Sequence, residues 1–173
     1  MQAEEKLNGM MPEAYDALHR IAAAQLGRER ANHTLTPTAL INEAYLRIAG
    51  QSNNDFAGQT DFCVAFAATS RRVLVDYARS RNCEKRGGRD RQRVPLDTSL
   101  LFDNEIPVDI LDLDEALRVL EDVSPERAQV VELRYFGGLT ENEVAERLDV
   151  SRTSVQKLWR GARAWLRAQL SHA

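Results

Sequence analysis

The sequence has few cysteines, no long apolar run and no group of side chains typical of an enzyme. Its two cysteines, Cys63 and Cys83, stand apart from any histidine cluster, so neither a disulfide framework nor a zinc site is indicated. No segment approaches the roughly 18 continuous apolar residues of a membrane span, and the N-terminus lacks a signal-peptide pattern. The three histidines are scattered, and no glycine-rich loop leads into a phosphate-binding lysine. We expect a cytoplasmic protein that is not an enzyme, binds no metal or cofactor and does not associate with membranes.

The net charge of −3 hides a strong segregation along the chain. Residues 71–93 hold nine basic and three acidic groups, residues 94–126 hold one basic and ten acidic groups, and residues 151–173 hold five basic groups and no acid. Because local charge sets the attraction for phosphates, this order suits a protein that contacts a polyanion at two places. Solvated helix faces would give the same pattern, so charge alone leaves both interpretations open.

Apolar residues recur at helical spacing through most of the chain, which predicts an all-α protein made of two small helical domains. In the first domain, residues 1–85, helices are expected over about 12–27, 37–49 and 61–82, with Pro12 and Pro37 in first turns. Phe62, Phe66 and Tyr77 lie on one face of the third helix, and we assign them to the core rather than to DNA.

The segment 86–110 contains paired glycines, two prolines and many acids, so it is predicted to be a flexible acidic linker. The helical pattern returns in the second domain, residues 111–173. One helix should stop near Ser124, and the next should end at Gly137 and Gly138.

Residues 139–160 have the pattern of a helix-turn-helix. Thr140 and Glu143 form a capping-box pair before a short helix, and Asp149 falls where the turn needs a positive backbone angle. We expect Val150 to fill the gap between the two helices and Ser151 to cap the second.

The second helix of this motif should bury Val155, Leu158 and Trp159. The outward side chains are of the types that donate to base edges and phosphates: Arg152, Thr153, Ser154, Gln156, Lys157 and Arg160. A helical hairpin with a solvated basic face is the alternative, but the joint spacing of caps, turn and apolar residues favours DNA binding.

The stretch SPERAQVVELRYFGGLT (124–140), together with the motif that follows and AWL (164–166), resembles the C-terminal domain of the extracytoplasmic-function (ECF) sigma factors. TPTALINEAYLRI (36–48) resembles the helix of that family that docks on RNA polymerase. Residues 62–81, with VDYAR at 75–79, resemble the helix of its minus-ten domain. The resemblance spans about residues 10 to 170, although Ala65 and Arg72 stand where the family often has Trp and Asn.

The resemblance implies a sigma factor that directs core RNA polymerase to promoter DNA, with an anti-sigma factor left open as a third partner. The C-terminal domain would read the minus-thirty-five element and the N-terminal domain the minus-ten element. The residues expected to contact DNA are Ser151, Arg152, Thr153, Ser154, Gln156, Lys157, Arg160, Arg163, Arg71, Arg72, Arg79 and Arg81. Those expected to contribute to the polymerase-binding surface are Leu40, Glu43, Tyr45, Leu46 and Arg47.

Several interpretations stay open at this stage. The loop holding Asn53, Asn54, Asp55 and Phe56 could receive an unstacked base. The acidic linker could lie along a basic channel of the polymerase or act only as a spacer. A stand-alone helix-turn-helix regulator is the nearest alternative function, but it would not need the first domain. A regulator-binding interaction protein would not need the basic helix.

Overall fold

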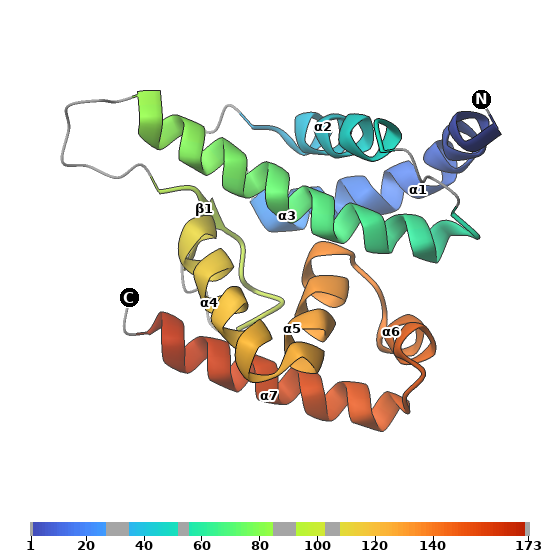
Figure 1. Cartoon of the computed structure of the whole chain (residues 1–173). Helices are drawn as coiled ribbons and strands as arrows, with labels where there is room; N and C mark the ends of the chain where they lie inside the picture. Colours follow the sequence, from blue (N-terminus) through green and yellow to red (C-terminus); the bar gives the residue numbers. More distant parts are fainter. Residues whose placement is uncertain (1, 27–34, 52–55, 85–92, 103–107, 172–173) are drawn as a thin grey trace.

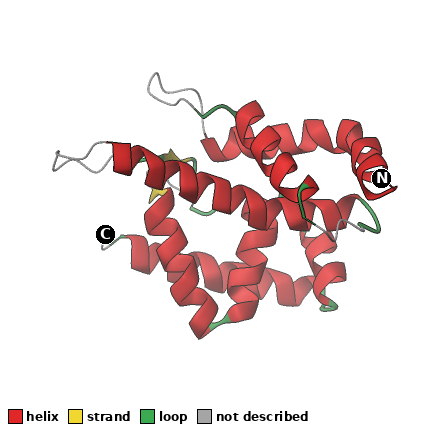
Figure 2. Cartoon of the chain, turned by 45° about the horizontal axis from the view of Figure 1, so that its top comes forward, coloured by secondary structure: helices red, strands yellow, loops and turns green. Residues whose placement is uncertain are grey.

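The computed structural model describes residues 2–26, 35–51, 56–84, 93–102 and 108–171, and it is almost entirely helical there (Figure 1, Figure 2). The all-α prediction is confirmed, with one two-stranded sheet added. In chain order the elements are α1 (Gln2–Leu26), α2 (Pro37–Ala49), α3 (Gln59–Glu84), β1 (Pro95–Leu96), β2 (Val108–Asp109), α4 (Ile110–Val123), α5 (Pro125–Val131), the π-helix η1 (Glu132–Phe136), α6 (Glu141–Leu148) and α7 (Arg152–Leu170).

The first half of the chain is a three-helix unit of α1, α2 and α3. Thr36 caps α2, because its hydroxyl accepts a hydrogen bond of 3.2 Å from the Ala39 amide, and Pro37 occupies the first turn as predicted. Phe62, Phe66 and Leu18 are completely buried between these helices. The core assignment of the two phenylalanines is therefore confirmed.

The start predicted for the first helix is wrong. Helix α1 begins at Gln2, ten positions before Pro12, and continues through that proline. A proline removes one backbone hydrogen bond from a helix interior but does not have to end the helix. Leu7, Met10 and Met11 precede Ala14 at helical spacing, so the apolar pattern continues on the N-terminal side of Pro12 and the proline was a misleading start signal.

The second half consists of α4, α5, η1, α6 and α7. Asp109 caps α4, since its Oδ1 accepts from the Leu111 amide at 2.8 Å. The expected stop at Ser124 is confirmed, and the next helix widens into η1 and ends at Gly137. Gly138 has a φ of +66°, a left-handed conformation that glycine adopts without strain.

The segment predicted to be a flexible spacer contains buried residues in the parts that the structure describes, although Arg93, Ser99 and Leu100 are exposed. Pro95 and Leu96 pair with Asp109 and Val108 in an antiparallel register. Val94, Leu101 and Phe102 are at most 2% exposed. Burying an apolar side chain of this size contributes about 1.5–3 kcal/mol, which offsets part of the entropy lost when the segment is ordered. The acidic composition of the segment did not indicate that these apolar residues are buried.

The two halves form two layers, with α3 lying across α4 and η1 (Figure 1). The connecting segment joins both layers. The Asp97 amide donates to the Gln25 carbonyl of α1 at 2.8 Å, and the Asp97 carbonyl accepts from the Tyr135 hydroxyl at 2.7 Å. Gln25 is itself 1% exposed and donates to the Tyr135 carbonyl at 2.9 Å. The connecting segment and α1 are therefore both tied to η1 of the second half.

Candidate nucleic-acid interface

Helices α6 and α7 form the helix-turn-helix that the sequence predicts. Thr140 and Glu143 make both bonds of a capping box: the Thr140 hydroxyl accepts from the Glu143 amide at 3.3 Å, and the Glu143 carboxylate accepts from the Thr140 amide at 2.7 Å. Asp149 has a φ of 53°, as expected for the turn. Its amide returns to the carbonyls of Ala145 and Glu146, which fixes where α6 ends.

Helix α7 begins at a second cap. The Ser151 hydroxyl accepts from the Ser154 amide at 3.1 Å. Val155 is fully buried and Trp159 is 8% exposed, whereas Leu158 is half-buried. The opposite face turns exposed or partly exposed polar side chains to solvent: Arg152, Thr153, Ser154, Gln156, Lys157 and Arg160. The predicted split between an inward and an outward face is thus found in the structure.

The sequence suggested that Val150 fills the space between α6 and α7, and this prediction is wrong. Val150 is 40% exposed, while Val144 and Val155 are completely buried there. The left-handed turn at Asp149 directs the following residue outward, and the valines inside the helices take over the packing.

Glu141 fixes the N-terminal part of the recognition helix α7. Its carboxylate accepts 3.0 Å from Arg152 Nε and 2.8 Å from Gln156 Nε2. The hydrogen bond from Gln156, followed by that from Arg152, lowers the pKa of Glu141 below its ordinary value. Arg134 of η1 lies 3.7 Å from the same carboxylate and stacks 4.4 Å from the Trp159 ring. No local pattern predicts this cluster, because its members are up to 25 positions apart.

Arg163 differs from its expected place among the DNA-contacting residues. Its Nε donates to the Leu101 carbonyl of the connecting segment at 2.5 Å, and the side chain is only partly exposed. The packing of residues 94–102 against α7 draws this guanidinium away from the outward face.

The four arginines expected to contact DNA from α3 occupy different environments. Arg71 is turned into the molecule, with a side chain 13% exposed, where it makes ion pairs with Asp114 and Glu132. Arg72 and Arg79 are exposed. Arg81 is half-buried, and its guanidinium donates to the Tyr77 hydroxyl at 3.1 Å and lies over that ring.

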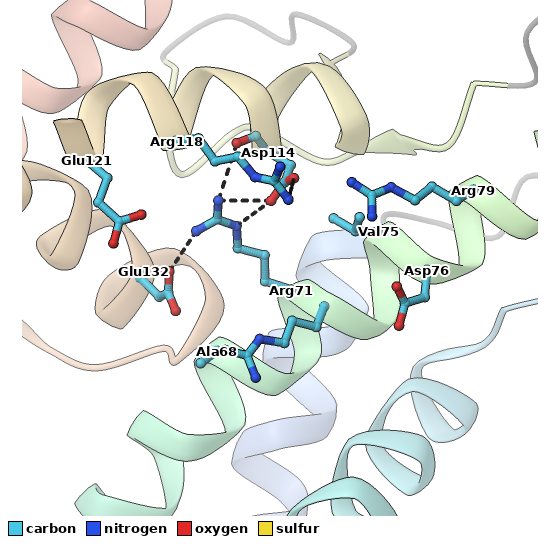
Figure 3. A pocket seen from close by; sticks show the side chains of 10 residues that line it. Ala68, Arg71, Val75, Asp76, Arg79, Asp114, Arg118, Glu121 and Glu132 are labelled. Atoms are coloured by element: carbon cyan, nitrogen blue, oxygen red, sulfur yellow. Dashed lines mark hydrogen bonds and ion pairs between the residues drawn. The ribbon is translucent and has the colours of Figure 1, made fainter. Parts of the chain in front are cut away.

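A cleft of about 280 Å³ follows this face of α3 and is walled on the other side by α4 and η1 (Figure 3). Arg71, Arg72, Arg79 and Arg118 line it together with four acids, Asp76, Asp114, Glu121 and Glu132. Both sides of the cleft therefore carry charge, and the acids come mainly from the second half of the chain.

The residues expected on the polymerase-binding surface divide into exposed and buried ones. On α2, Leu46 is 64% exposed and Glu43 is exposed beside it. Arg47 bridges Glu43 at 3.0 Å and Asp76 of α3 at 2.7 Å. Tyr45 is half-buried. Leu40 is completely buried, so it supports this surface from the core and does not belong to it.

The loop expected to receive an unstacked base is described only at its end. Asn53, Asn54 and Asp55 lie outside the described residues. The Phe56 ring is half-buried and packs edge-on against Phe62, with ring centroids 5.7 Å apart. In this arrangement Phe56 extends the core of the first half.

Over the part of the chain that the structure describes, no group of three or more potential metal ligands comes together. Within the same residues, every helix is too short or too polar to cross a bilayer.

These features define a class of protein: a helix-turn-helix DNA-binding protein with a second helical unit that DNA recognition by the motif alone does not require. The family model described as ECF sigma factor matches residues 3–172. The chain therefore belongs to the ECF sigma factor family. A search of the curated proteins gave no match.

The family match covers both halves, so the alternative of a stand-alone regulator has nothing to favour it. The protein is a sigma factor that directs RNA polymerase in transcription initiation. Members of this family are DNA-binding regulatory proteins, and the nucleotide chemistry belongs to the polymerase.

Proposed function

We propose that the two halves of this sigma factor have separate tasks on one promoter. Residues 111–173 read the minus-thirty-five element through α7, residues 1–85 contact the minus-ten element through α3, and residues 86–110 connect them. Core RNA polymerase binds the exposed face of α2 around Glu43 and Leu46. The protein works in the cytoplasm, where the polymerase transcribes.

The observation that carries this proposal is the outward face of α7. Arg152, Thr153, Lys157 and Arg160 are exposed on a helix whose other face is buried, and the motif's caps fix its direction. A helix of this kind enters the major groove with its N-terminal residues at the base edges. Before DNA binds, hydrogen bonds to Glu141 hold the side chains of Arg152 and Gln156 in place, which reduces the conformational entropy that they lose on binding.

Promoter-specific transcription with purified core polymerase tests the proposal. The chain should start transcripts at discrete sites, found by sequencing transcript ends, whereas core polymerase alone should not. A Leu46→Asp variant should lose binding to core polymerase while keeping its helical circular dichroism. Val123→Asp, at the end of α4 and 65% exposed, is the matched control for an apolar residue replaced by an acid outside α2. Specific DNA binding without any initiation would contradict the proposal.

A further inference from the structure

Glu141 is an acidic side chain that lies among the donors of the outward face of α7. It is the first residue of α6, and its Oε2 atom accepts from Arg152 Nε at 3.0 Å and from Gln156 Nε2 at 2.8 Å. The Glu141 side chain is 23% exposed, whereas that of Arg152 is 62% exposed. A carboxylate beside a DNA backbone repels the phosphates, so the charge of Glu141 by itself weakens binding. Any favourable contribution of Glu141 therefore comes through the two side chains that it holds.

The other side of this carboxylate is fixed from inside the fold. Glu141 Oε1 lies 3.7 Å from Arg134 Nη1 of η1, and the Arg134 side chain is 17% exposed. The Arg134 guanidinium stacks 4.4 Å from the centre of the ring of Trp159, a buried residue of α7. The capping box of Thr140 and Glu143 holds the backbone at the start of α6. Packed residues therefore set the position of the Glu141 carboxylate before any DNA is bound.

The contacts of Glu141 decide which hydrogen-bonding groups of α7 remain for DNA. An ionised carboxylate only accepts hydrogen bonds, so the amide nitrogen of Gln156 has to face it. The Gln156 Oε1 atom then points away from Glu141 as an acceptor. Arg152 uses Nε for Glu141, which leaves its terminal nitrogens Nη1 and Nη2 for a ligand. Glu141 thus presents two donors of Arg152 together with the acceptor of Gln156.

This set of donors and acceptors matches particular base edges in the major groove. Two guanidinium donors fit the O6 and N7 acceptors of guanine, and an amide oxygen accepts from the amino group of adenine or cytosine. Arg152 and Gln156 are four positions apart on α7, which corresponds to about 6 Å along a helix. Base steps are about 3.4 Å apart, so the two side chains can reach nearby base pairs of one element.

We propose that Glu141 is a specificity-determining positioning residue of the recognition helix. It directs the terminal donors of Arg152 to a guanine and the acceptor of Gln156 to a base that carries an amino group. Without the carboxylate, the Gln156 amide can turn over and accept either kind of base edge, so the preference for a base is lost before the affinity. The inference rests on the proposed reading of the minus-thirty-five element by α7.

A purely structural role of Glu141 would have a different consequence. If the carboxylate only stabilised the helix-turn-helix, its loss would lower the stability of the protein and weaken binding to every duplex alike. The test therefore measures base preference separately from overall affinity and from the free energy of unfolding.

The experiment uses the full chain assembled with core RNA polymerase. The promoters found by sequencing transcript ends supply the duplex, and the minus-thirty-five element is randomised in it. Bound duplexes are sequenced to obtain the preference at each base pair. Arg152→Ala and Gln156→Ala first identify the base pairs that these two side chains read. Glu141→Gln is then compared with Glu146→Gln, which removes the same charge from an exposed position of α6.

Glu141→Gln should lower the preference at those base pairs by at least about fivefold and leave the preference at the other base pairs unchanged. The affinity for the unselected pool should not fall, since a negative charge near the phosphates has been removed. Glu146→Gln should keep the full preference. In a chain that already carries Arg152→Ala and Gln156→Ala, the change at Glu141 should have no further effect on base preference, because the side chains it acts through are absent.

Glu141→Asp separates the position of the carboxylate from its charge. The shorter side chain keeps the charge but withdraws the oxygen from Arg152 and Gln156, so the preference should relax as it does with glutamine. Full preference in either Glu141 variant would overturn the inference, and so would an equal loss of affinity for all duplexes accompanied by a lower free energy of unfolding. If the unaltered chain shows no base preference anywhere in the element, the proposed function itself fails.

Discussion

Helices α3 and α7 are both rich in arginine, yet they present their charges in opposite ways. On α7, Arg152, Lys157 and Arg160 are exposed, and the apolar residues face inward. On α3, Arg71 is enclosed by carboxylates from α4 and η1, while its neighbour Arg72 is exposed. The difference shows that a basic segment is accessible to a nucleic acid only where the rest of the fold leaves it uncovered.

Replacing Arg71 should affect stability far more than replacing Arg72. Arg71→Ala leaves the Asp114 carboxylate, 9% exposed, without its main partner, and we expect the free energy of unfolding to fall by about 2–3 kcal/mol. Arg72→Ala should change it by no more than about 0.5 kcal/mol. Urea unfolding followed by circular dichroism measures both. Similar losses at the two positions would remove the contrast between them.

Replacing Lys157 and Arg160 should affect DNA binding and leave stability nearly unchanged. Each alanine substitution should lower the slope of log affinity against log salt by about one, since one phosphate contact is lost. Arg20→Ala, an exposed arginine on α1, is the matched control and should leave the slope as it was. Fluorescence anisotropy with a promoter duplex at several salt concentrations gives these slopes. An unchanged slope for the α7 variants would show that α7 does not face the phosphates.

The N-terminal cap of α7 should contribute to the stability of the protein, whereas the exposed charges of α7 should not. Ser151→Ala removes the acceptor for the Ser154 amide, and the free energy of unfolding should fall by about 1 kcal/mol. Ser80→Ala, at an exposed position of α3, serves as the control and should change it by less than about 0.5 kcal/mol. A loss of similar size in both variants would mean that the cap does not organise the recognition helix.

The two cysteines of α3 should differ in reactivity, because only one is enclosed. Burial, with a smaller contribution from Glu143, raises the pKa of the Cys63 thiol from 9.0 to about 11. Cys83 is exposed. Iodoacetamide at pH 8 should therefore label Cys83 at least about tenfold faster, as followed by mass spectrometry. Equal labelling rates would indicate that the N-terminal part of α3 is uncovered in solution.

The raised pKa of Cys63 also has a consequence for stability. Its folded pKa lies above the value in the unfolded chain, so the folded state keeps the proton longer. The contribution of the protonated Cys63 thiol to the free energy of unfolding is complete below pH 9 and is lost as the pH rises towards about 11. Cys63→Ser should remove this loss of stability at alkaline pH, whereas Cys83→Ser should leave it unchanged.

The sequence predicted features that are built from neighbouring residues. The caps at Thr140 and Ser151 and the positive angle at Asp149 are confirmed, because each depends on hydrogen bonds within a few positions of the chain. The predicted start of α1 was wrong because a proline is typical of a first helical turn but does not require one, and the apolar spacing continues on its N-terminal side. The β1–β2 pair was missed because two-residue strands are too short to show alternation.

Environments of single side chains were predicted less well. The family resemblance placed Leu40 on the polymerase-binding surface, the turn pattern placed Val150 between two helices, and Arg163 was expected to contact DNA. The structure buries the first, exposes the second and ties the third to the Leu101 carbonyl. No sequence pattern indicated the role of Glu141, although it accepts hydrogen bonds from Arg152 and Gln156 on the outward face of α7. In each case the deciding neighbour comes from another element of the fold.

Taken alone, the sequence determined the helices, their caps and the helix-turn-helix, since these depend on backbone hydrogen bonds and apolar spacing over a few turns. Only the tertiary structure decided which basic side chains reach solvent. Arg71 meets Glu132 across 61 positions of the chain, and Arg163 meets Leu101 across 62. Burial and ion pairing depend on residues brought together by packing, so no local pattern can specify them.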